Sequence, residues 1–202
     1  MRYFHFAQKI DKMNQLFFKR KAALLALPMA LSILLPACSH NPADVAAKWT
    51  KDIKNKIIED ASKTPDKTVF DSAHQQLTLF KDGKKLKQYS FAKRENADES
   101  EKAIYDTAMI VLYSDDQNFQ LIKLPCTPKS ERTYEGVAYK GNRMGFAEYQ
   151  YCKKALRETG FHYNNLNVGP WTEYDSTGKA VETKDMGNDD KLNTLEAIRY
   201  AR

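Results

Sequence analysis

The sequence predicts an α+β fold, in which an antiparallel β meander is flanked by an N-terminal and a C-terminal helix. An amphipathic segment with an apolar residue at every fourth position lies within residues 38–65. Short alternating segments separated by turn residues fill 66–186, and a second apolar periodicity lies within 187–202. Helix signals therefore stand on either side of a long run of strand signals.

The first 37 residues have the layout of a secretory signal, so they are expected to be removed. The basic run Lys19-Arg20-Lys21 precedes an uncharged apolar stretch at 22–35, which ends before a small residue and a cysteine. Such a stretch is too short to span a bilayer core of about 30 Å comfortably, so a permanent transmembrane helix is the weaker interpretation. Met13 is an alternative start that gives a shorter basic region.

Leu35-Pro36-Ala37-Cys38 resembles the lipobox of bacterial lipoproteins, in which the cysteine after the cut carries a diacylglycerol. The resemblance implies that Cys38 is acylated, with chains such as palmitate, and anchors the protein. At about 0.8 kcal/mol for each buried CH₂, two or three acyl chains hold a protein on a membrane. An Asp directly after the acylated cysteine would resemble a signal for retention in the inner membrane. This chain has Ser39 at that position, so the expected location is the outer membrane, facing the periplasm. The alternative is an ordinary secretory signal followed by an unrelated cysteine.

The net charge of the chain comes mostly from its signal segment. The chain has 32 basic and 26 acidic residues, a net charge of +6. Residues 1–37 contain six of the basic residues and one acidic residue, which leaves a net charge of +1 for the remainder. Nucleic-acid binding needs a clustered excess of Lys and Arg, so it is not expected.

Cys126 and Cys152 are an even pair of cysteines in a chain that is expected to be exported. Disulfides persist in oxidising compartments, so these residues are predicted to be joined, with two buried free thiols as the alternative. Their wide spacing contains no CxxC pattern, which argues against a redox centre or a zinc site.

Residues 38–65 are predicted to form a tether and an amphipathic helix, with Asn41 as N-cap and Pro42 in the first turn. The apolar stripe consists of Val45, Trp49, Ile53, Ile57 and Ala61. It either packs on the folded domain, the preferred interpretation, or lies on the membrane with Trp49 at the interface. At the other end, Asn188 is expected to cap the C-terminal helix, whose apolar face consists of Leu192, Leu195 and Ile198.

Strands are expected at 68–73, 76–81, 86–92, 109–113 and 119–124. Asp82-Gly83 is a hairpin signal between two of them. The polar stretch 93–102 has no apolar periodicity and is expected to be a loop or a short solvated helix. Residues 124–128 must leave the sheet, because their two prolines lack the N–H group of a strand ladder.

Residues 134–151 and 158–175 are similar to each other at a spacing of 24 positions. The matched residues are Gly136 and Gly160, Tyr139 and Tyr163, Gly141 and Asn165, and Gly145 and Gly169. After a slip of one residue, Phe146, Glu148 and Tyr149 match Trp171, Glu173 and Tyr174. The period predicts a repeated strand–turn–strand unit, with Gly or Asn at the turn and alternate aromatic residues on the buried face.

These units resemble the MORN-repeat variant, a short β-hairpin repeat with spaced glycines, aromatic residues and a final Gly-Lys. The resemblance is carried by Gly160, Gly169, Trp171, Tyr174, Gly178 and Lys179, and more loosely by Gly136, Gly141, Gly145 and Tyr149. It covers about residues 133–186, and residues 77–86 look like a worn third copy. It implies a hairpin architecture and a role in membrane association, scaffolding or antitoxin-like binding, without choosing among them.

The sequence has no HExxH, GxSxG, P-loop or dinucleotide motif, so no catalytic residue, cofactor or metal is expected. His162 alternates with Phe161 and Tyr163 and is expected to point out of the sheet in a structural role. We therefore expect a non-catalytic envelope lipoprotein that binds a protein, the cell wall or a lipid surface. The tyrosines of the repeats motivate this expectation: Tyr134, Tyr139, Tyr149, Tyr151, Tyr163 and Tyr174. The alternatives are an antitoxin or immunity-like protein that binds a toxin and, more weakly, an envelope enzyme acting on glycan or peptide.

Overall fold

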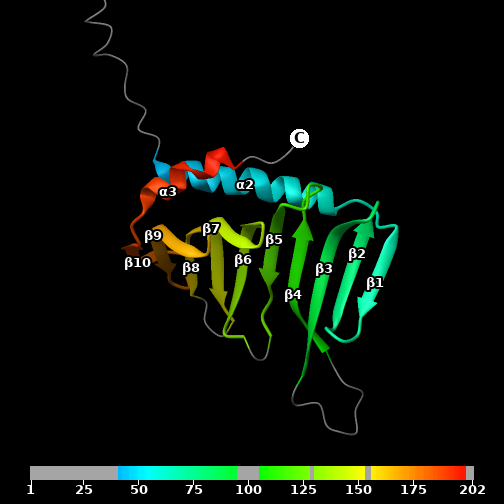
Figure 1. The fold of residues 1–202 in the computed structure, drawn as a ribbon. Helices are drawn as coiled ribbons and strands as arrows, with labels where there is room; N and C mark the ends of the chain where they lie inside the picture. Colours follow the sequence, from blue (N-terminus) through cyan, green and yellow to red (C-terminus); the bar gives the residue numbers. More distant parts are fainter. Residues whose placement is uncertain (1–40, 95–104, 128–129, 153–155, 199–202) are drawn as a thin grey trace, which may run out of the picture. The chain divides into compact units, whose positions relative to one another are not determined.

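The computed structural model describes residues 41–94, 105–127, 130–152 and 156–198. The signal segment, Cys38 and most of the polar stretch 93–102 lie outside the described residues. Within them, the strands form one antiparallel sheet in chain order, and the helices are segregated from it (Figure 1). The predicted α+β class and antiparallel meander are therefore confirmed.

Each described strand pairs only with its neighbours in sequence. The strands are β1 (Lys67–Asp71), β2 (Gln76–Lys81), β3 (Lys84–Lys93), β4 (Tyr105–Tyr113), β5 (Phe119–Leu124), β6 (Arg132–Tyr139), β7 (Asn142–Tyr151), β8 (Arg157–Tyr163), β9 (Leu166–Tyr174) and β10 (Ala180–Asp185). β2 and β5 have the predicted bounds. β4 begins four residues before its predicted start, because its polar first residues pair with the end of β3. β1 and β10 are the two edges, and every residue in them is exposed.

The long helix α2 (Pro42–Ala61) packs on one face of the sheet. The Asn41 side chain caps it by accepting a hydrogen bond from the Ala43 N–H at 3.0 Å. The residues Trp49, Ile53 and Ile57 are buried in one core with Phe119 and Leu121 of β5. Figure 1 shows α2 lying across the strands, and it contacts β3 to β7. The apolar stripe of α2 is thus covered by the sheet, which is the preferred one of the two alternatives.

Two short elements, α3 (Asp189–Asn193) and η1 (Leu195–Ala197), take the place of the single C-terminal helix predicted over 187–202. Leu192 and Leu195 are fully buried in the α2 core, and Trp49 Nε1 donates a hydrogen bond to the Ile198 carbonyl at 2.9 Å. The prediction that the Asn188 side chain caps α3 is wrong, since it makes no capping hydrogen bond. Side-chain capping needs an extended backbone, and Asn188 is left-handed with a φ of 61°.

Two glycines with left-handed backbones, Gly145 in β7 and Gly169 in β9, bring the helices close to the sheet. A Cβ atom on Gly145 would lie 2.2 Å from Thr50 Oγ1 of α2, and one on Gly169 would lie 2.8 Å from Leu192 Cδ1 of α3. The Phe146 N–H donates a hydrogen bond to Thr50 Oγ1 at 2.8 Å. The absence of a side chain at these glycines therefore sets the distance between helix and sheet.

The sulfur atoms of Cys126 and Cys152 lie 2.14 Å apart, at disulfide distance. Changing both residues to Ala is expected to lower the free energy of unfolding by about 3 kcal/mol, because the bridge restricts the unfolded chain. Urea denaturation of the double variant, and of the unchanged chain with and without reductant, measures this loss. Reduction and substitution should have the same effect, and a stability that neither alters would contradict the prediction.

Candidate functional site

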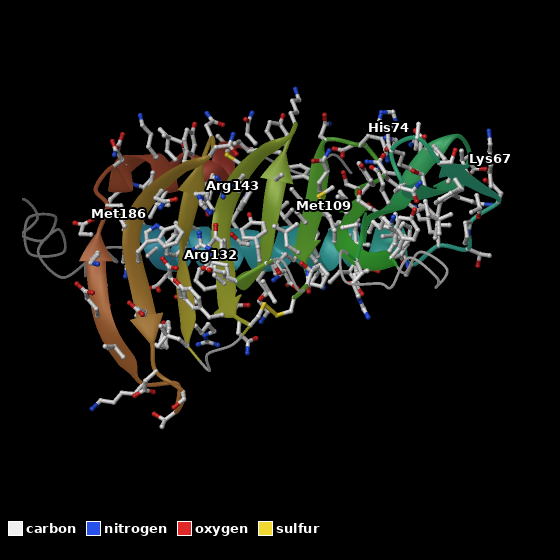
Figure 2. All side chains as sticks on the ribbon, turned by 90° about the horizontal axis from the view of Figure 1, so that it is seen from below. Lys67, His74, Met109, Arg132, Arg143 and Met186 are labelled. Carbon is white, nitrogen blue, oxygen red and sulfur yellow. A yellow bond between two sulfur atoms is a disulfide. The ribbon has the colours of Figure 1, made fainter. Side chains whose placement is uncertain are left out.

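The candidate site lies on the sheet face opposite α2. Side chains alternate between the two faces of a strand, so Phe161 and Tyr163 of β8 pack toward α2 while His162 between them points to the opposite face. No described helix packs on that opposite face. Figure 2 shows this face with α2 behind the sheet, and Arg132 of β6 and Arg143 of β7 lie on it. We refer to Arg132, Arg143, Tyr134, Tyr149, His162 and Trp171 as the arginine–aromatic cluster.

Four rings from four adjacent strands form the base of this cluster. The ring centroids of Tyr134 and Tyr149 are 5.0 Å apart, those of Tyr149 and Trp171 are 5.9 Å apart, and those of His162 and Trp171 are 5.4 Å apart. Such separations are favourable for aromatic pairs. None of the four residues is more than 7 % exposed, although none of the helices that the structure describes covers them. The rings therefore bury one another and form a second, smaller core on this face.

Glycines make room for two of these rings. A Cβ atom on Gly160 would lie 2.1 Å from the Trp171 ring, and one on Gly136 would lie 2.3 Å from the Tyr134 hydroxyl oxygen. Each ring thus lies directly over a glycine, where any other residue would push it away from the sheet. These two glycines occupy strand interiors, whereas Gly141 and Asn165, with φ of 84° and 68°, are in the hairpin turns.

A chain of hydrogen bonds links Arg143, Tyr149 and His162. Arg143 Nη1 donates to the Tyr149 hydroxyl at 3.3 Å, and that hydroxyl lies 2.9 Å from His162 Nε2. Because a guanidinium only donates, the Tyr149 oxygen accepts from Arg143. The same oxygen can accept a second hydrogen bond or donate its proton, so either Tyr149 or His162 can be the donor between them.

His162 is neutral near pH 7 in the folded protein. Burial lowers its pKa from 6.5 to about 4, and the positive charge of Arg143 adds to this effect. The Leu166 backbone near the ring raises the pKa of His162 slightly and so opposes part of this effect. It does not form a regular hydrogen bond with the ring. As expected, His162 alternates with Phe161 and Tyr163 and points to the other face of the sheet, but it is not exposed there, since it is 1 % exposed. Tyr134 of β6, Tyr149 of β7 and Trp171 of β9 cover it.

The lowered pKa of His162 predicts that the folded protein loses stability in acid. Between pH 6.5 and 4 the unfolded chain binds a proton at residue 162 that the folded protein does not bind, so stability falls as the pH falls through this range. The expected loss from this residue is about 3 kcal/mol. It is measured as the difference between urea denaturation of the unchanged chain and of His162→Gln at a series of pH values. Parallel pH profiles for the two proteins would contradict the prediction.

The Tyr134 hydroxyl has no hydrogen-bond partner in the part of the chain that the structure describes, although the atom is buried. Burial raises the pKa of Tyr134, Tyr149 adds to the increase, and Arg143 opposes it. The hydroxyl therefore keeps its proton at neutral pH and remains a donor. A buried donor without an acceptor is unfavourable by about 1–3 kcal/mol, so this atom is an exception that needs an explanation.

Arg143 differs from the other arginines of the described ranges. Arg94 pairs with Asp106 at 2.5 Å, Arg132 with Glu158 at 3.3 Å, and Arg157 with Glu148 at 3.8 Å. Within those same ranges Arg143 pairs with no carboxylate, and its only side-chain hydrogen bond is the one to Tyr149. The charge of its half-buried guanidinium is thus not balanced by a nearby acid.

A groove of about 430 Å³ lies along β4 to β8, lined among others by Lys123, Glu135, Glu148 and Arg157. Glu135 forms ion pairs with Lys54 of α2 and with Lys123, the second at 2.9 Å. Partial burial raises the pKa of Glu135, but the two lysines outweigh it and lower the pKa overall. A general acid needs a raised pKa, so Glu135 is poorly suited to the glycan chemistry of the enzyme alternative.

The six repeat tyrosines do not form an exposed surface. Tyr134 and Tyr149 are buried, and the other four, Tyr139, Tyr151, Tyr163 and Tyr174, are half-buried. Tyr134 and Tyr149 pack on each other, and Tyr139 packs on Phe119. The sequence reasoning did not single out Arg132 and Arg143. Alternation places Arg143 and Tyr149 on the same face of β7, and this was the available signal for Arg143.

Among the described residues, no three His, Cys, Asp or Glu side chains converge on a position where they could hold a metal ion. No described helix combines the length and the apolar character needed to cross a bilayer. Comparisons of the chain with protein-family models, with curated proteins and with solved structures find no match.

Proposed function

We propose that this protein is a lipid-anchored, non-catalytic binding module of the cell envelope, which binds its partner on the sheet face opposite α2. The observation that carries the proposal is the Arg143 guanidinium. It lies on a face that no described helix covers, and no carboxylate in the described residues pairs with it. Charged groups that lack a partner within their own chain are common at recognition sites, where they give specificity.

The anchor in this proposal is Cys38, within the segment that resembles a lipobox. Acylation of Cys38 after removal of residues 1–37 would hold the sheet at a membrane, with the outer membrane as the proposed location. The binding face would then meet partners of the periplasm, the cell wall or the membrane surface. It is not proposed for nucleic acid, since the chain after residue 37 has a net charge of only +1.

We also propose that the hairpins β6–β7 and β8–β9 are two copies of one repeated unit, similar to the MORN-repeat variant. Supporting this, Gly145 and Gly169 have similar left-handed backbones, with φ of 72° and 60°, and each lies against a helix. Gly136 and Gly160 also each lie under an aromatic ring, but Tyr134 comes from the same strand as Gly136 and Trp171 from the strand after Gly160. The support for duplication of a hairpin therefore comes from the pair Gly145 and Gly169.

Photo-crosslinking in intact cells tests the proposed function. A photoreactive residue at Lys184 of β10, which lies opposite Trp171 across the strand pair, reports on the proposed face. The same group at Lys51, on the exposed side of α2, is the matched control. We expect one dominant crosslinked partner from position 184 and not from position 51. Cys38→Ala should release the protein from the membrane fraction and abolish the crosslink.

The outcomes separate the alternatives. Equal crosslinking from positions 184 and 51, or none from either, would overturn the proposed face. A Cys38→Ala variant that remains bound to the membrane would overturn the anchor. A toxin as the dominant partner would identify the immunity-like alternative, and this result would be independent of the anchor.

A further inference from the structure

The further inference concerns what binds at Arg143, and it rests on the function proposed above. A guanidinium has five N–H donors and no acceptor. Among the described residues Arg143 uses only one of them, in a long hydrogen bond of 3.3 Å to Tyr149. The Tyr134 hydroxyl is a second donor of the cluster without an acceptor. Its ring centroid lies 5.0 Å from that of Tyr149, the residue that Arg143 contacts. Arg143 and Tyr134 therefore both lie next to Tyr149.

The neighbouring groups of the cluster do not supply an acceptor. The Tyr149 oxygen is shared between Arg143 and His162. Glu158, the acid that pairs with Arg132, also accepts a hydrogen bond from the Tyr151 hydroxyl at 3.4 Å. Trp171 Nε1 donates to the Phe161 carbonyl at 3.3 Å. The site is thus rich in donors and poor in acceptors, which is the opposite of a cation site.

We propose that Arg143 and Tyr134 bind an oxyanion of the ligand, a carboxylate or a phosphate group. Both groups have several acceptor oxygens and match the flat, forked donors of a guanidinium. The Tyr134 hydroxyl is buried in the structure, so the anion reaches it only after side chains above it move, and the proposal includes a shift of Arg143 away from Tyr149. The shift breaks one long hydrogen bond, which is weak at 3.3 Å. The anion then restores acceptors to both donors.

An NMR titration of the full-length protein in detergent micelles tests this site. The probes are acetate and inorganic phosphate, each compared with chloride at equal ionic strength near neutral pH. We expect a saturable shift of the Arg143 Nε–H and Trp171 Nε1–H signals with acetate, phosphate or both, and none with chloride. Whichever probe gives the tighter binding identifies the class of oxyanion.

Three variants make the test specific. Arg143→Gln should abolish saturable binding, whereas Arg157→Gln, at an arginine that already pairs with Glu148, should retain it. Tyr134→Phe should weaken binding by about tenfold, because a hydrogen bond to a charged group is lost. The same Tyr134→Phe change should leave the melting temperature unchanged or raise it, because it removes a buried donor without an acceptor. This variant keeps the test decisive even if Arg143→Gln fails to fold.

Three results would overturn the inference: equal shifts with chloride, no saturable shift with either probe, or unchanged binding in Arg143→Gln. Unchanged anion affinity in Tyr134→Phe together with a lower melting temperature would also overturn it, since the hydroxyl would then have a structural role only. The proposed function is tested separately, because a partner crosslinked from position 184 stands whether or not a small oxyanion binds.

Discussion

Changing Trp171 to Ala is expected to lower the free energy of unfolding by about 4 kcal/mol. The ring is 6 % exposed, lies directly over Gly160, and meets both Tyr149 and His162. Its removal leaves a cavity in a small core on which no helix of the described ranges packs. It also leaves the Phe161 carbonyl without the N–H group that it accepts from. Urea denaturation measures the loss.

Two further variants show whether the fit between ring and glycine is the cause. Gly160→Ala inserts a methyl group 2.1 Å from the nearest ring atom of Trp171, so it should destabilise the chain by about 2 kcal/mol through overpacking. When Gly160→Ala is added to Trp171→Ala, it should lower the free energy of unfolding much less, because the ring that the methyl group would meet is absent. Val181→Ala, at a strongly exposed position on β10, is the neutral control. A Trp171→Ala loss no larger than that of Val181→Ala would contradict the second core.

Changing Gly145 to Ala is the other substitution with a large expected effect, a loss of about 4 kcal/mol from two separate causes. Its backbone is left-handed, with a φ of 72°, which is unfavourable for any residue with a Cβ atom. The new Cβ atom would also lie 2.2 Å from Thr50 Oγ1 and 2.9 Å from the Trp49 ring. α2 therefore has to move away from the sheet.

Gly141→Ala is the matched control for this substitution. Gly141 also has a positive φ, of 84°, but no atom lies within 4 Å of the position of a Cβ. Gly141→Ala should therefore lower the free energy of unfolding only by the cost of the left-handed backbone, about 1 kcal/mol. The difference between the two variants measures the cost of displacing α2, and it should decrease when Thr50→Ala removes the nearest atom. Equal losses at Gly145 and Gly141 would mean that helix contact has no part in the effect.

Local sequence patterns predicted the helices and strands of this fold better than they predicted which side chains meet on each face of the sheet. Asn41, Pro42 and the apolar stripe predict where α2 begins and which face it buries, because capping and a period of four are local properties. β2 and β5 were predicted at their observed bounds, because alternation and turn residues are local as well. Asn188 shows the limit of such reasoning. A suitable residue type does not cap a helix when its backbone is left-handed.

The candidate site could not be predicted in the same way. The burial of His162 depends on Tyr134, Tyr149 and Trp171, which reach it from other strands and not from its own. Register decides such contacts, and one residue of slip would place these side chains on different faces. An arginine in a strand is equally uninformative until its cross-strand neighbours are known. Arg143 stands out only by comparison with the acids that pair with Arg94, Arg132 and Arg157.

The meander arrangement has a consequence for the order in which the molecule assembles. Each strand pairs with the next one in sequence, so hairpins close through short loops and can form early. α2 is synthesised before all the strands, yet Thr50 bonds to Phe146, 96 positions later, and Trp49 bonds to Ile198, 149 positions later. These two hydrogen bonds can form only after most of the chain has emerged, whereas the contacts of α2 with β3 to β5 can form earlier. Until those strands have been made, the apolar stripe of α2 has no sheet to pack on, and this interval is when the chain is most vulnerable to aggregation.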